Sequence, residues 1–287
     1  MQGKALSKWM WIALVPLVAA CSTTVLHAPS ETTPPAFLPV VAPLAGASVF
    51  DHCGVGCPSG GSLLTLSRQA YKLNNNGTTK FANWVAYKIT KSSSANGSIR
   101  KWQTDPDIPA GETLTPEDYK GASAALSIDR GHQANLASMA GARDWKSLNY
   151  MSNITPQKAD LNQGPWAHLE VKVRELSKRK GINAVHVITG PLYERFVGTL
   201  PGTSKVHTIP SGYWKILFTG STPEKGLYAS FVMDQNTPRT ANFCDFQVTV
   251  DQIESRSGLT VWSGLSDQVQ NRLKSVQGRL PEMLGCS

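Results

Sequence analysis

The chain has 287 residues, 41% of them hydrophobic and 17% charged, and its formal net charge is +8 at pH 7. Residues 48–287 contain neither a linker nor an internal repeat, which excludes a repeat array and fits one large domain with a sizeable core. The basic balance suits a polyanionic partner, but a solvated basic surface gives the same charge, so charge alone assigns no function.

The N-terminus has the pattern of an export signal. Lys4 and Lys8 precede an apolar run at residues 9–20, which is too short to span a bilayer and is typical of a signal peptide. Small residues stand directly before Cys21, and this arrangement resembles the lipobox of bacterial lipoproteins. The resemblance implies that residues 1–20 are removed and that the Cys21 thiol is acylated.

The segment that follows predicts a tether. Residues 21–47 are rich in proline, carry Glu31 as their only acid and have no helical or strand period, so we expect an extended, disordered linker. Ser22, directly after the acylated cysteine, implies transit to the outer membrane. We therefore expect a lipoprotein of the bacterial cell envelope that faces the periplasm or the cell surface. The alternative is an ordinary secretory signal, cut elsewhere, which gives a secreted protein.

Four further cysteines form an even set in a chain bound for an oxidising compartment: Cys53, Cys57, Cys244 and Cys286. Two disulfides are expected, and the sequence alone leaves three connectivities open. Half of a zinc site at the first two cysteines is a weaker interpretation, because no matching Cys/His pair lies nearby.

Strands and helices are both predicted in residues 48–287. Apolar, β-branched runs predict strands at 81–90, 124–128, 184–189, 214–218, 227–233 and 246–250. Apolar residues spaced three and four apart predict a helix over 166–180, with Pro165 in its first turn and Gly181 at its end, and a second helix over 266–276. The elements do not alternate regularly, so we predict an α+β fold with a mainly antiparallel central sheet flanked by helices.

The residues that carry chemistry are concentrated in one stretch. His132 ends an Asp-Arg-Gly-His motif that follows the strand predicted at 124–128, where a loop can direct its ring into a groove. An imidazole with a pKa near neutrality can take a proton from water. Asn162 offers an amide oxygen to a hard cation, and the arginine of the motif can bind phosphate. Metal-assisted cleavage of a phosphodiester requires this combination.

Seven short segments, in the same order along the chain, resemble the Serratia-type sugar-non-specific DNA/RNA endonucleases: residues 53–57, 81–87, 129–133, 152–157, 161–164, 189–193 and 234–238. The resemblance implies a ββα-metal active-site motif and Mg²⁺ as cofactor, with Mn²⁺ as a candidate substitute. It implies hydrolysis of single- and double-stranded DNA and RNA to 5′-phosphorylated products. It also implies the disulfides Cys53–Cys57 and Cys244–Cys286, and a homodimer.

The same resemblance assigns two central roles. His132 becomes the general base, so activity is expected to fall below about pH 6.5, the ordinary histidine pKa. Asn162 becomes the protein ligand of Mg²⁺, although an Asn before a helix is more often an N-cap. Glu170 becomes a carboxylate that positions water around the metal; a surface ion pair with Arg174, four residues on, is the alternative.

Three more residues complete the predicted site. Arg130 and Arg100 match the phosphate-binding arginines of the family, where a guanidinium offsets charge that grows in the transition state. Asn153 resembles a site residue with a supporting hydrogen-bond role. Asp129 is expected to be structural and to support the loop. We expect recognition of backbone phosphates, because no segment resembles a base-reading module.

Two other functions are compatible with part of the pattern. A surface lipoprotein that binds nucleic acid without cleaving it shares the charge and the tether, but it does not need His132 and Asn162 together. A zinc-dependent phosphomonoesterase needs a denser His/Asp cluster than this sequence offers. We therefore predict a Mg²⁺-dependent non-specific endonuclease that occupies residues 48–287.

Overall fold

The computed structural model of the chain describes residues 51–95 and 99–287. Residues 48–287 form one compact unit. The predicted signal peptide, the acylated Cys21 and the tether lie outside the described residues. In the part of the chain that is described, no helix is both long and apolar enough to cross a bilayer.

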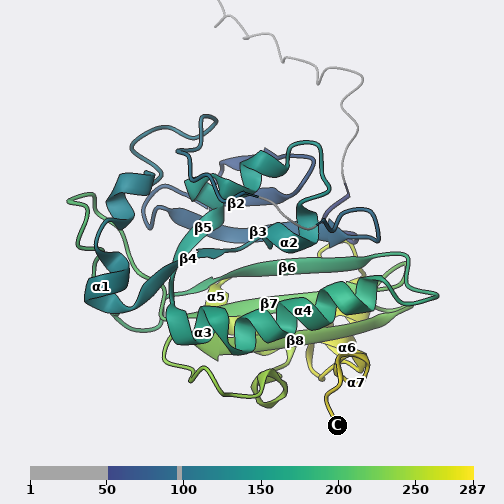
Figure 1. The fold of residues 1–287 in the computed structure, drawn as a ribbon. Helices are drawn as coiled ribbons and strands as arrows, with labels where there is room; N and C mark the ends of the chain where they lie inside the picture. The colour runs from purple at the N-terminus through teal and green to yellow at the C-terminus, as the bar shows by residue number, and fades with distance from the viewer. Residues whose placement is uncertain (1–50, 96–98) are drawn as a thin grey trace, which may run out of the picture. The chain divides into compact units, whose positions relative to one another are not determined.

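Six of the described strands form one antiparallel sheet in the order β1-β2-β3-β6-β7-β8 (Figure 1). Their bounds are β1 (Thr65–Ser67), β2 (Lys72–Asn76), β3 (Phe81–Ile89), β6 (Val185–Leu192), β7 (Gly212–Thr219) and β8 (Leu227–Asp234). The α+β fold with a mainly antiparallel central sheet is therefore confirmed.

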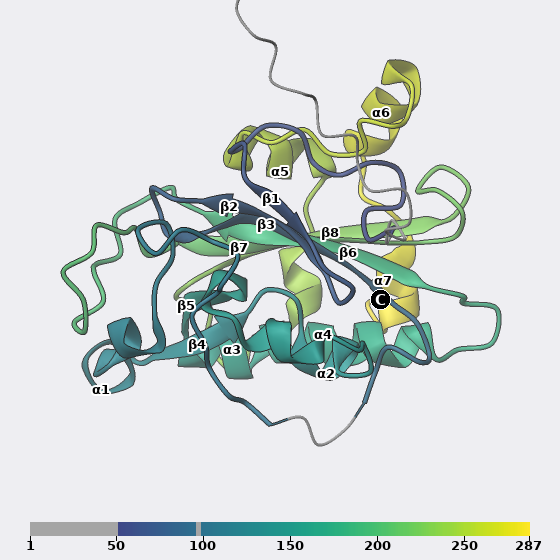
Figure 2. The same ribbon diagram turned by 90° about the horizontal axis from the view of Figure 1, so that it is seen from above.

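Helices cover both faces of this sheet (Figure 2). On one side lie α2 (Leu136–Met139), α4 (Pro165–Ser177) and α7 (Leu280–Leu284), and on the other lie α5 (Val250–Ser257) and α6 (Asp267–Lys274). Successive side chains of a strand point to opposite faces. In β7, Tyr213 and Leu217 enter the core beneath α4, whereas Trp214 and Ile216 enter the core beneath α5.

A second, two-stranded antiparallel sheet stands beside the large one. It pairs β4 (Ile128–His132) with β5 (Ile154–Lys158), and α3 (Ala159–Gln163) follows β5 directly and leads into α4. Gly131 lies opposite Thr155, and a Cβ at Gly131 would collide with the Gln157 side chain. Two strands followed by a helix are the order that a ββα-metal motif requires.

Two predicted strands are wrong. Residues 122–126 form α1 (Ala122–Leu126), because this alanine-rich segment favours a helix, and Ser127 ends it with a φ of 53°. The strand begins only at Ile128 and so contains the Asp-Arg-Gly-His motif instead of preceding it. At 246–250, Thr249 caps α5 through a reciprocal capping box with Gln252, which commits Val250 to a helix.

The other boundaries differ by a few residues. The helix predicted over 166–180 ends at Ser177, and the helix predicted over 266–276 spans Asp267–Lys274. Strands β1, β2 and β5 were not predicted. Short 3₁₀ turns lie at Pro116–Tyr119, Trp145–Asn149, Met151–Asn153 and Phe243–Phe246.

Both predicted disulfides are confirmed: Cys53 pairs with Cys57, and Cys244 pairs with Cys286. The first closes a short loop near the N-terminal end of the described residues. The second joins the start of the C-terminal region to the chain end, where α7 packs into the same core as α4.

We expect the second disulfide to contribute more stability. It is separated by 42 residues and the first by 4, and the entropy that a cross-link removes from the unfolded chain grows with loop length. Replacing Cys244 and Cys286 by Ser should lower the free energy of unfolding by about 4 kcal/mol, and replacing Cys53 and Cys57 by about 2 kcal/mol. Urea unfolding of the two double variants measures the difference; equal losses would contradict the loop-length argument.

Candidate active site

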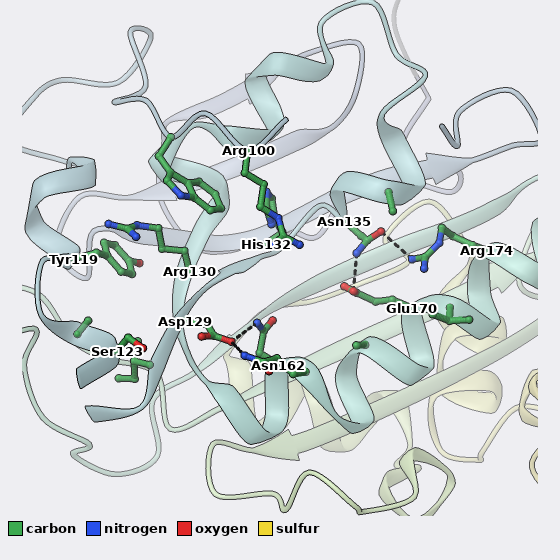
Figure 3. Close-up of a pocket in the computed structure, with 17 residues that line it drawn as sticks. Arg100, Tyr119, Ser123, Asp129, Arg130, His132, Asn135, Asn162, Glu170 and Arg174 are labelled. Carbon is green, nitrogen blue, oxygen red and sulfur yellow. Dashed lines mark hydrogen bonds between the residues drawn. The ribbon is translucent and has the colours of Figure 1, made fainter. Parts of the chain in front are cut away.

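A pocket of about 530 Å³ opens between β4, the N-terminus of α2, α3 and α4 (Figure 3). The segment that carries Arg100 and Trp102 closes it from one side. Six residues that the sequence singled out line this pocket: Arg100, Asp129, Arg130, His132, Asn162 and Glu170. The pocket thus gathers residues that lie up to 70 positions apart in the chain.

His132 is the last residue of β4, where pairing with Ile154 fixes its backbone. Its Nε2 lies 3.4 Å from Asn149 Oδ1. The amide group of Asn149 is itself held, because its Nδ2 donates to the Ile99 carbonyl. An amide oxygen only accepts, so this contact favours the tautomer with the proton on Nε2 and the lone pair on Nδ1.

The charge state of His132 is set by its surroundings. Burial lowers its pKa to about 4, and Arg100 acts in the same direction, whereas the hydrogen bond with Asn149 opposes the change. Its ring centroid lies 5.2 Å from that of Trp102. The imidazole is therefore neutral at neutral pH and can accept a proton.

Asn162 lies within α3 and is not an N-cap, since Gly164 occupies the N-cap position of α4. Its Nδ2 donates to Asp129 Oδ2 at 2.9 Å, and Gln163 Nε2 donates to the same oxygen at 2.7 Å. Because Asp129 takes the amide nitrogen, the amide oxygen faces the other way, into the pocket (Figure 3). Within residues 51–95 and 99–287 that oxygen has no hydrogen-bond partner.

Glu170 is held at both carboxylate oxygens. Oε2 accepts from Asn135 Nδ2 at 2.6 Å, and Oε1 lies 3.3 Å from Lys215 Nζ. Arg174 does not pair with Glu170; its NH1 group donates to Asn135 Oδ1 at 3.0 Å. Asn135 therefore stands between the acid and the arginine and binds both (Figure 3).

Three arginines reach the pocket, and none forms an ion pair with a described residue. Arg100 lies beside His132, and Arg174 lies near Glu170 (Figure 3). The Arg130 guanidinium carbon lies 5.8 Å from the ring centroid of Trp102 and 5.3 Å from that of Tyr119. Arg130 NH2 donates to the Pro116 carbonyl at 2.8 Å and Arg174 NH1 to Asn135, but these partners are uncharged, so the positive charge of each guanidinium is available to a polyanion.

Asn153 does not line the pocket. It is fully buried, and its amide bonds to both the backbone N–H and the carbonyl of Ala134 and to the Leu148 carbonyl. The two bonds to Ala134 fix the backbone two residues beyond His132, and the third ties it to Leu148. Asn153 thus touches the site only through the chain that carries His132.

Sequence reasoning missed two side chains that organise the pocket, Asn135 and Arg174. Asn135 caps α2 by accepting from the Ser138 N–H at 2.9 Å, and an Asn three residues before a Ser is a weak signal of such a cap. Arg174 follows Glu170 by one helical turn, and from this spacing the sequence suggested only an ion pair between the two residues. Trp102 and Tyr119, which flank Arg130, carried no signal in the sequence.

Comparisons with known proteins agree with this architecture. The chain superimposes with a TM-score of 0.63 on a chain of the crystal structure of the EndoG/EndoGI complex, at 24% identity, covering 75% of this chain and 91% of that chain. This likeness shows the fold. In sequence, the Serratia marcescens nuclease is 60% identical over 238 residues, which are 83% of this chain and 90% of the relative. A Nostoc sp. nuclease is 28% identical over 283 residues, 92% of this chain and 95% of the relative.

The β4–β5 hairpin followed by α3, with the pocket beside it, has the arrangement of a ββα-metal fold. The sequence model of the DNA/RNA non-specific endonucleases matches residues 48–268, and the chain belongs to that family. The predicted family is therefore confirmed. The protein is an enzyme, and the alternative of a non-catalytic binding protein is set aside.

Proposed function

We propose that this nuclease hydrolyses phosphodiester bonds of single- and double-stranded DNA and RNA in the presence of Mg²⁺, with His132 as general base and 5′-phosphorylated products. The observation that carries the proposal is one pocket that combines a neutral imidazole, an uncommitted amide oxygen, a fixed carboxylate and three arginines. The nuclease names of the relatives support the substrate class.

The residues of the pocket fit a hydrated divalent cation. No cluster of three or more His, Cys, Asp or Glu side chains that could hold a metal occurs among the described residues. Mg²⁺ prefers oxygen ligands, dehydrates reluctantly and is commonly held by only one or two protein groups. Asn162 Oδ1 would hold it, and Glu170 would hold water beside it. When bound, Mg²⁺ polarises the phosphate and stabilises the departing oxygen.

The protein residues supply the remaining steps. His132 Nδ1 accepts a proton from the attacking water as the water oxygen bonds to phosphorus and the bond to the 3′ oxygen breaks. Arg100, Arg130 and Arg174 offset the negative charge that grows on the phosphate oxygens. Because these groups address the phosphate rather than a base, cleavage is expected to be nearly independent of sequence.

The overall test is nicking of a supercoiled plasmid and of an RNA transcript, each with Mg²⁺ and with a chelator. Cleavage of both polymers in Mg²⁺, and loss of cleavage with chelator, is the expected result. End-labelling with and without phosphatase identifies the 5′-phosphate. Undiminished cleavage in chelator would contradict the Mg²⁺ dependence.

Replacing His132 by Ala should lower kcat by about 10²- to 10⁴-fold, the usual contribution of a general base, with little change in affinity for DNA. His168→Ala is the matched control, because His168 is an exposed residue of α4 outside the pocket. Thermal unfolding of both variants should resemble that of the wild type. Near-normal nicking by the His132 variant would refute the assignment.

The pH dependence follows from the lowered pKa of His132. The base works only when neutral, so a lower pKa extends activity to lower pH. The acid limb of the kcat profile should have its midpoint near pH 4 rather than near 6.5, because burial lowers the pKa of His132 to about 4. A midpoint at or above 6.5 in Mg²⁺ would contradict the influence of burial.

Replacing Asn162 by Ala should raise the Mg²⁺ concentration at half-maximal activity by about tenfold or more. Asn162→Asp adds charge and should change the preference between Mg²⁺ and Mn²⁺ without abolishing binding. Asn236→Ala, at an exposed asparagine outside the pocket, is the control. Calorimetric titration with Mn²⁺ checks metal binding apart from catalysis; equal binding by wild type and Asn162→Ala would remove Asn162 as the ligand.

We propose further that the nuclease is a lipoprotein of the bacterial envelope, anchored in the outer membrane through Cys21, with residues 22–47 as its tether. The two disulfides occupy all four cysteines of the described region, which leaves Cys21 for acylation. The family resemblance also implies a homodimer. This is a separate proposal, and a measurement of the molecular mass in solution tests it.

Cys21→Ser should abolish lipid labelling and move the protein from the membrane to the soluble fraction, since two or three acyl chains give stable anchoring and a thiol-free N-terminus gives none. The specific activity of the purified variant should equal that of the wild type. Intact-mass analysis of the native protein is the direct measurement, and an unmodified N-terminus other than Cys21 would overturn the lipoprotein proposal.

A further inference from the structure

A lysine lies beneath the pocket, on a mainly apolar face of the large sheet, where Thr189 is its cross-strand neighbour. Lys215 stands in β7 between Tyr213 and Leu217, and its side chain is 1% exposed. Its Nζ lies 3.3 Å from Glu170 Oε1 and 4.3 Å from the centroid of the Trp166 ring. The pKa of Lys215 is lowered by burial, and the nearby Glu170 carboxylate opposes this.

Glu170 is the sole carboxylate within ion-pair distance of Lys215 among the residues that the structure describes. Lys215 therefore has one ion-pair partner among the described residues. A buried charge is retained at a cost in desolvation, and a more apolar side chain of similar volume would fill the same space beneath α4. The Trp166 ring favours a cation beside it, but the filling of space beneath α4 does not require one.

The geometry gives Lys215 a different task. It holds one oxygen of Glu170 from the sheet, while Asn135 holds the other oxygen from α2. Asn135 cannot turn its amide, because its Oδ1 accepts from both the N–H and the hydroxyl of Ser138. Two fixed contacts from opposite elements leave the carboxylate no freedom to rotate.

Glu170 has another partner within reach of its helix. Arg174 lies four residues on, a spacing at which Glu and Arg side chains commonly pair on a helix surface. In the structure they do not pair, because Glu170 is bound by Lys215 and Asn135 and Arg174 is bound by Asn135. Without Lys215, Glu170 Oε1 would be free to turn toward Arg174 and neutralise a guanidinium of the pocket.

We propose that Lys215 is a positioning residue of the nuclease reaction, which fixes the Glu170 carboxylate in the pocket and keeps it from pairing with Arg174. This inference rests on the proposed role of Glu170 beside the bound cation. Lys215 touches neither the substrate nor the metal in this scheme and acts only through Glu170.

The chain offers a matched control for a buried lysine–glutamate pair. Lys274 has a side chain that is 6% exposed and lies 2.7 Å from Glu254, and neither residue lines the pocket. Lys274→Met and Lys215→Met therefore remove the same kind of pair, one away from the site and one beneath it. Both variants are expected to unfold at a lower temperature than the wild type.

The test is a double-mutant cycle on kcat with Lys215→Met, Glu170→Gln and the combined variant, run at a temperature where circular dichroism shows all of them folded. Lys215→Met should lower kcat by about 10- to 100-fold, the scale of a catalytic group displaced by about 1 Å. In the Glu170→Gln background the same substitution should have almost no further effect, because the group through which it acts is already gone. Lys274→Met should keep wild-type kcat.

Two outcomes of the cycle overturn the inference: a wild-type kcat in Lys215→Met, or the same fold-loss in both backgrounds. A kcat loss in Lys274→Met equal to that in Lys215→Met would also overturn it, since the effect would then be general destabilisation. The proposed role of Glu170 fails separately, if Glu170→Gln itself retains wild-type kcat. If Lys215→Met alone does not fold, the kcat of the combined variant, which has no unpaired charge, is compared with that of Glu170→Gln. Equal kcat values are expected, and a lower kcat in the combined variant would overturn the inference.

A readout without catalysis completes the test. In a crystal structure of Lys215→Met, the Glu170 carboxylate should have left its present position and lie against the Arg174 guanidinium. An unchanged carboxylate would contradict the positioning role. Affinity for a short DNA duplex, measured in chelator, should fall in Lys215→Met and recover in the combined variant. The reason is that Glu170 can neutralise Arg174 only when its carboxylate is both charged and released from Lys215. Equal affinities in all the variants would contradict the pairing with Arg174.

Discussion

The packing of α4 against the large sheet determines the geometry of the whole site. Trp166, Leu169, Val173 and Leu176 bury one side of this helix in the core, and the flank of the same helix carries Glu170 and Arg174 into the pocket. Any rotation of α4 would move both groups together and expose apolar surface, which makes such a rotation costly. The hairpin of β4 and β5 then brings His132 to the same side, so that hydrophobic burial fixes the distances between charged groups.

Asparagine amides set the orientation of the reactive groups. Asn149 holds the His132 ring, Asn135 separates Glu170 from Arg174, and Asn153 fixes the backbone beyond the motif. An amide does not titrate, so the asparagine side of each contact presents the same donor or acceptor at any pH at which the protein is folded. The pocket can therefore keep its geometry while the charge of one imidazole changes.

Much of the fold could be predicted from the sequence, because long strands and the amphipathic α4 have clear periodicity. The errors occurred where short segments follow local rules: the alanines of α1 favour a helix, and the Thr249 cap starts α5 inside an apolar run. For the site, motif order located His132, Asn162 and Glu170, all of which line the pocket. Asn135 and Lys215 could not be found in this way, because their roles depend on contacts between α2, α4 and β7 that are distant in sequence.

The Cys244–Cys286 disulfide also bears on where the enzyme reaches its stable, active form. It secures α7, which packs into the same core as α4, the helix that carries Glu170 and Arg174. Thiols stay reduced in a bacterial cytoplasm, and disulfides form after export to an oxidising compartment. A chain that is exported as proposed therefore passes the genome of its own cell before this bond has formed. On that proposed route the least stable form of the enzyme would be the one inside the cell, and oxidation would act as a maturation step after export.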